Sequence, residues 1–191
     1  GAGLLDQDFN ITPISTMLVN ADNPQLLLNS FGLGLTVADI ATMDPWQLAQ
    51  NEDSTAEQLL RTNQQLLGLM LTANSLVTID GQIGSADVNA TLAELLSDYA
   101  QNNSDAVNLA NAEVLGSLLT DTAGALEVPL AGQSAEIVAS RLAVLNEILI
   151  DPEIAPTEEV AATVISSSQV ELQTAVEQLG SGEIDNAGFD S

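Results

Sequence analysis

The chain has 191 residues, of which 46% are hydrophobic but only 3% aromatic, and it carries 27 acidic residues against two basic ones, for a net charge of −25. This composition excludes disorder over most of the chain, because the aliphatic residues suffice for a core. It also excludes nucleic acids and anionic membrane surfaces as expected partners, because the charge repels phosphate groups.

Short helices are predicted in the N-terminal part, where capping side chains precede prolines. Thr, Asn and Asp accept hydrogen bonds from the first turn, and proline suits the first helical position. Such starts occur at Thr12-Pro13, Asn23-Pro24 and Asp44-Pro45, and Thr36 caps a further short helix over residues 37–43.

The longest predicted helix begins with a capping box of Ser54 and Glu57 and extends to about Leu76. Its apolar residues recur at helical spacing: Leu59, Leu60, Leu66, Leu67, Met70 and Leu71. After a turn at residues 80–84, the next helix opens at Ser85 or Asp87. Its apolar face is formed by Val88, Leu92, Leu95, Leu96 and Tyr99.

The second half of the chain continues the helical pattern. We expect a helix over residues 107–119, a looser connection over 124–132, and an amphipathic helix from Ser134 to Asp151-Pro152. A last helical stretch follows Pro156 and ends near Gly180.

The sequence therefore predicts an all-α fold, a compact bundle of about seven to nine helices. Residues 1–10 would be a lead-in, 11–180 one helical domain with its weakest boundary at 124–132, and 181–191 a flexible tail. A solenoid is the alternative architecture, although no fixed-period repeat supports it. No run reaches the roughly 18 apolar residues of a membrane span, so we expect no membrane insertion.

Conventional catalysis has few candidate groups here. The chain contains no His, Cys or Lys, so carboxylates, hydroxyls and two Arg remain, and disulfides are excluded. Carboxylate pairs can hydrolyse glycosides, and the candidates are Glu158 with Glu159 and Asp98 with Asp105. One Trp and one Tyr offer too small an aromatic platform for a sugar. We expect no enzyme activity and no cofactor other than calcium, with a carboxylate hydrolase as a remote alternative.

Calcium is the natural cation for an acidic surface, because it prefers oxygen ligands. The best local cluster lies between Asp80 and Asp87, although it lacks the regular ligand spacing of an EF-hand. A second cluster lies in the tail, at Glu183, Asp185, Asn186 and Asp190. The alternative to either site is diffuse attraction of counterions.

The two basic residues, Arg61 and Arg141, stand alone among carboxylates. We expect each to form a structural ion pair, because a guanidinium binds a carboxylate through two parallel hydrogen bonds. The alternative is that they hold a ligand.

The segment from Ile11 to Leu18, ITPISTML, resembles the "TPLTTL" opening of helical modules in very large bacterial secreted and surface proteins of the RTX or cadherin-like, calcium-rich adhesin kind. The resemblance covers about residues 9–76, and Met17 and Trp46 depart from it where aliphatic residues would be expected. Its further motifs are Phe31-Gly32-Leu33, Asp39-Ile40, Asp44-Pro45, Asn51-Glu52-Asp53 and Asn63-Gln64-Gln65-Leu66.

This resemblance implies an extracellular or cell-surface location and a place as one module of a long chain. The start, Gly1 to Leu5, lacks the basic region of a signal peptide, which fits a piece of a longer protein. The expected function is a non-catalytic structural or adhesive module, with neighbouring modules of the same chain and a surface or matrix component as partners. The alternative is a helical carrier for a small hydrophobic ligand in a cavity between helices.

Overall fold

The computed structural model describes residues 12–43, 53–77, 83–103, 106–130 and 134–151, together with residues 170, 174–176 and 178. This part of the chain contains helices and no strands, which confirms the all-α prediction. The predicted helix at Asp44-Pro45, the lead-in and the tail lie outside it, as does most of the stretch after Pro156. The bounded helices are α1 (Pro13–Asn20), α2 (Pro24–Ser30), α3 (Val37–Thr42), α5 (Ser54–Val77), α6 (Ser85–Asn102), α7 (Ala112–Ala125) and α8 (Ser134–Ile150).

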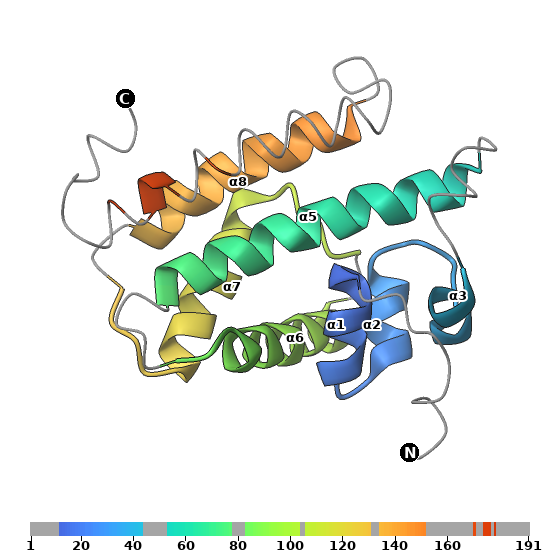
Figure 1. The fold of residues 1–191 in the computed structure, drawn as a ribbon, viewed down its shortest axis with the longest axis horizontal. Coiled ribbons are helices and arrows are strands. Elements are labelled where there is room, and N and C mark those ends of the chain that lie inside the picture. The colour runs from blue at the N-terminus through green and yellow to red at the C-terminus, as the bar shows by residue number, and fades with distance from the viewer. Residues whose placement is uncertain are drawn as a thin grey trace.

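The long helix α5 runs through the middle of the bundle (Figure 1). It packs against α1, α6, α7 and α8, and α8 lies on the opposite side of it from α1 and α6. The short helices α2 and α3 pack beside α1, and α7 lies along α8. One buried cluster draws aliphatic residues from all these helices and from Val176. This central position explains why α5 is buried on most of its circumference.

The helix starts predicted in the N-terminal part are confirmed at three positions. Thr12 Oγ1 accepts from Ser15 N at 3.2 Å, and Ser15 Oγ accepts from Thr12 N at 2.8 Å, so the two residues form a reciprocal cap. Asn23 Oδ1 accepts from Leu26 N at 3.2 Å. Thr36 caps α3 in the same reciprocal way with Asp39, and α3 ends at Thr42.

The start of α5 differs in detail from the predicted capping box. The side chain of Asp53 accepts hydrogen bonds from Thr55 N and Ala56 N, both at 3.0 Å. Ser54 is already the first residue of the helix. The cap therefore lies one residue earlier than predicted, because a carboxylate accepts two N–H groups and complements the positive end of the helix dipole.

The prediction of a helix over residues 107–119 was wrong in its bounds. Residues 107–111 are not helical, and Val107 N donates to Ser30 O at 2.8 Å, which ties this segment to the end of α2. The helix begins at Ala112 because Asn111 Oδ1 accepts from Glu113 N at 2.9 Å and from Val114 N at 3.1 Å. It continues to Ala125, into the predicted connection over 124–132.

Candidate functional site

A stripe of polar side chains runs along the N-terminal half of α5. Its positions are spaced three and four residues apart, so they share one face of the helix. They are Ser54, Glu57, Gln58, Arg61, Thr62 and Gln65. Exposure falls along this α5 stripe, from an exposed Ser54 to Thr62 and Gln65, which are only 7% and 8% exposed. The inner end of the stripe is therefore polar where a core helix would be apolar.

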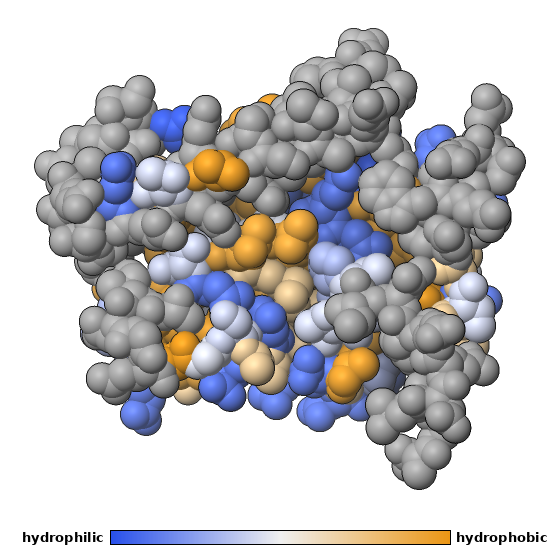
Figure 2. All heavy atoms as spheres, viewed as in Figure 1, coloured by the Kyte–Doolittle hydropathy of each residue, from blue (hydrophilic) through white to orange (hydrophobic). Residues whose placement is uncertain are grey.

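The α5 stripe lines a cleft of about 330 Å³. The opposite wall is apolar and comes from three other places in the chain: Phe31 at the end of α2, Val107 and Leu109 in the segment before α7, and Ile150 at the end of α8. Phe31, Val107 and Leu109 are buried, whereas Ile150 is about half exposed and forms the rim. Figure 2 shows hydrophilic residues over this half of α5 and apolar residues farther along it. The volume falls in the range of small-molecule sites.

Hydrogen bonds between separate elements hold the walls of this cleft in place. Gln65 Nε2 donates to Asn146 O of α8 at 3.3 Å, and Asn146 Nδ2 donates in turn to Leu109 O. Val107 N is held by Ser30 O. The cleft is therefore built by the fold, because its walls are fixed by contacts that do not involve a ligand.

The Arg61 side chain forms a hydrogen bond with the backbone of another helix. Its Nη1 donates to Leu149 O, one of the last carbonyls of α8, which have no partner within their own helix. Its positive charge also complements the negative end of the helix dipole. The last turn of α8 has no basic residue of its own and contains Glu147, a signal that a cation from elsewhere is needed. Sequence reasoning did not use that signal. The predicted carboxylate pairs of Arg61 and of the exposed Arg141 remain predictions.

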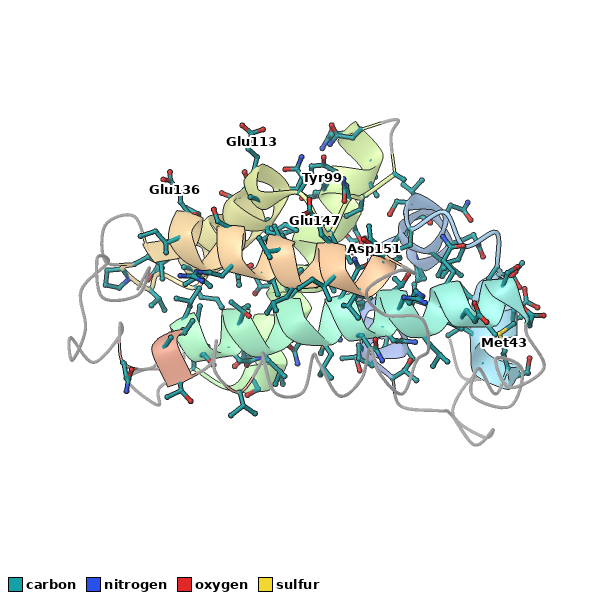
Figure 3. The ribbon with its side chains drawn as sticks, turned by 90° about the horizontal axis from the view of Figure 1, so that it is seen from above. Met43, Tyr99, Glu113, Glu136, Glu147 and Asp151 are labelled. Atoms are coloured by element: carbon teal, nitrogen blue, oxygen red, sulfur yellow. The ribbon has the colours of Figure 1, made fainter. Side chains whose placement is uncertain are left out.

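A second, wider cleft of about 680 Å³ lies between α7 and α8. The small residues Ala112 and Gly116 help to line it, and a Cβ added to Gly116 would lie 3.6 Å from Ala139 Cβ. Glu113 and Glu136 project outward from the two helices (Figure 3), and Asp121 also lines the cleft. In the described part of the chain, no three acidic residues are grouped so that they could hold a metal ion.

The predicted calcium ligands are only partly covered by the structure. Asp87 is exposed and lies in the first turn of α6, behind Gly84, whose cap position offers no side-chain acceptor. Its charge there complements the helix dipole. Asp80 and the tail cluster lie outside the described residues, and so do Asp105, Glu158 and Glu159. The Asp80–Asp87 site therefore remains a prediction.

No family model, curated protein or solved structure matches the chain. Among the described helices, none is both long and apolar enough to cross a membrane.

Proposed function

We propose that this chain is a non-catalytic helical module, structural or adhesive, of a large extracellular bacterial surface protein. The observation that carries the proposal is the ordered series of motifs from Ile11 to about residue 76, which resembles such modules. Neighbouring modules of the same chain are its proposed partners.

The chemistry of the described surface supports this proposal. Its ionisable groups are carboxylates apart from Arg61, Arg141 and Tyr99. Several polar side chains serve the backbone: Thr12, Asn23 and Thr36 cap helices, while Asn63 and Asn146 link separate elements. Such an arrangement suits a folded spacer or a binding surface. Polar residues outnumber apolar ones in the lining of both clefts, which favours the module over a carrier of hydrophobic ligands.

An antibody raised against the purified chain would test the proposal in the bacterium that encodes it. On an immunoblot of cell fractions, we expect a polypeptide far larger than the 19.8 kDa of this chain. Protease added to intact cells should remove that band, while a cytoplasmic marker protein stays intact. A band near the chain's own mass in the cytoplasmic fraction would contradict the proposal.

A further inference from the structure

The chain offers very few bonds to trypsin-like proteases, which cleave after Lys or Arg. It contains no Lys, and its two basic residues are Arg61 in α5 and Arg141 in α8. Every segment outside these two helices, including those that the structure does not describe, therefore lacks a basic residue. Proteases nick folded proteins mainly at exposed loop tips. The segments that join the described helices contain no bond that a trypsin-like protease recognises.

Both arginines lie well inside core helices, about two turns from the nearer helix end. The residues that follow them, Thr62 and Leu142, are only 7% and 0% exposed. Although the Arg141 side chain is exposed, the bond after it is thus followed by a fully buried leucine. The backbone N–H and C=O groups around each bond are paired within the helix, so the helix must unfold before a protease can bind the bond.

The Arg61 side chain is also part of the contact between α5 and α8. Its Nη1 donates to Leu149 O, and Gln65, one turn farther along α5, donates to Asn146 O. A trypsin-like protease binds the guanidinium in its own specificity pocket, so the hydrogen bond to Leu149 O must break before cleavage. The central helix α5 packs against four other helices and contributes to one common buried cluster (Figure 1). Its unfolding therefore disrupts the whole core.

We propose that the fold makes this chain resistant to trypsin-like proteases, which cut after Arg61 and Arg141 only when the bundle has unfolded globally. Cleavage itself is ordinary hydrolysis: water adds across the peptide bond and leaves a new carboxyl group and a new amino group. The resistance arises from the positions of the two arginines in the fold and not from the net charge. This inference goes beyond the proposed function and does not depend on it.

Digestion of the intact chain with a low concentration of trypsin, at increasing urea concentrations, tests the proposal. Mass spectrometry identifies the fragments, and a small chromogenic substrate corrects for the effect of urea on trypsin. Cleavage then follows the population of the unfolded state, and folding equilibrium constants of single domains are about 10³–10⁸. Without urea, both bonds should be cut at least about 1,000-fold more slowly than above the unfolding transition.

The urea dependence shows which opening exposes each bond. The logarithm of both cleavage rates should rise with urea with the m-value of global unfolding, measured by circular dichroism, because m scales with the surface exposed. Cleavage at either bond with a rate that is independent of urea below the transition would overturn the proposal, since it would mean that a local opening suffices.

Two variants with the same change of charge separate position in the fold from electrostatics. Glu127 is exposed in the connection after α7, and Glu94 is exposed within α6. Without urea, Glu127→Arg should be cut after residue 127 at least about 100-fold faster than after Arg61 or Arg141, because only a local opening is needed. Glu94→Arg should be as resistant as the unmodified chain.

Rapid cutting of Glu94→Arg at its new site, or equal resistance of the two variants, would overturn the proposal. The unfolding curve of each variant is measured in the same way, so that cutting is compared at equal stability. The urea series uses the unmodified chain, so a folding defect in a variant would not leave the question open.

Discussion

Three polar side chains of α5 satisfy backbone groups at the ends of other helices. Asn63 Oδ1 accepts from Ile14 N at 3.0 Å, at the N-terminal end of α1, while Gln65 and Arg61 donate to carbonyls near the end of α8. The first N–H groups and the last carbonyls of a helix have no partner within the helix. Asn63 and Arg61 supply two of these missing partners, and Gln65 adds a further hydrogen bond to a carbonyl of α8, so all three side chains contribute to the fold although they lie near the apolar core.

Asn63→Ala tests this role at a single residue. The substitution leaves the buried N–H of Ile14 unpaired, so we expect the free energy of unfolding to fall by about 1–3 kcal/mol in urea denaturation. Asn102→Ala is the matched control, because Asn102 is exposed and its side chain bonds only within α6. The control should change stability by less than about 0.5 kcal/mol. Equal losses in the two variants would contradict the role assigned to Asn63.

Asp39 gives a prediction about pH. The Thr36 hydroxyl and then the Thr36 backbone N–H donate to its carboxylate, at 2.7 and 2.8 Å, and hold the pKa of Asp39 below its ordinary value of 3.8. The unfolded chain binds the proton more readily, so this stabilisation is present above the ordinary pKa and is lost as the pH falls through the lower, folded value.

The Thr36→Val variant isolates the hydroxyl from the backbone N–H. The pKa of Asp39, followed by carboxyl carbon resonances during a pH titration, should rise toward 3.8 without reaching it, because the N–H of residue 36 still donates. Thr42→Val, at the other end of α3, should leave this pKa where it is in the unmodified chain. A pKa of Asp39 that does not respond to Thr36→Val would refute the assigned cause.

At the scale of the helix, substitutions at the start of α5 distinguish the predicted cap, Ser54, from the observed one, Asp53. Asp53→Ala should lower the free energy of unfolding by about 0.5–2 kcal/mol, because the N–H groups of residues 55 and 56 lose their acceptor. Ser54→Ala should have little effect, since Ser54 is exposed and already within the helix. Thermal or urea unfolding of the two variants compares them directly. A larger loss from Ser54→Ala would restore the predicted capping box.

The sequence predicted the start of a helix correctly where the residues that determine it are close to it in the chain. The starts at Thr12 and Asn23 were predictable because a cap and a proline act within a few residues. The start of α7 was misplaced because Val107 is tied to Ser30, which is distant in sequence. Leu67 was predicted in the apolar stripe of α5 but is 40% exposed, because side-chain spacing alone does not show which neighbours cover a helix.

The candidate site was harder to predict from the sequence than the helices. Arg61 was singled out as an isolated cation, but its backbone partner lies 88 residues away on α8. In the sequence, Thr62 and Gln65 have the spacing expected for the solvent-exposed polar face of an amphipathic helix. Only the packing of α2, α8 and the segment 107–109 around that face turns it into a cleft.

Across the whole molecule, the net charge of −25 opposes compaction, because like charges are brought together when the chain folds. Added salt should therefore stabilise the fold by screening this repulsion, since the Debye length falls from about 30 Å at 0.01 M to about 10 Å at 0.1 M. For a chain of this size, each kcal/mol gained raises the melting temperature by about 2–4 °C. Calorimetry in 0.01 and 0.1 M NaCl should show a clear rise, and an unchanged melting temperature would contradict it.

A comparison of calcium with magnesium distinguishes the screening of charge from binding at a defined site. At equal ionic strength, CaCl₂ and MgCl₂ should raise the melting temperature by the same amount if divalent ions only gather around the charge. A site that includes Asp87 and prefers Ca²⁺ would add RT ln(1 + [L]/Kd) for calcium alone, which is about 2.7 kcal/mol at 100 times Kd. That excess should then disappear in Asp87→Asn but persist in Asp121→Asn, a matched substitution on α7. In the described part of the chain no three carboxylates are grouped so that they could hold a metal ion, and Asp80 lies outside it, so the comparison of the two salts decides between the predicted site and diffuse attraction.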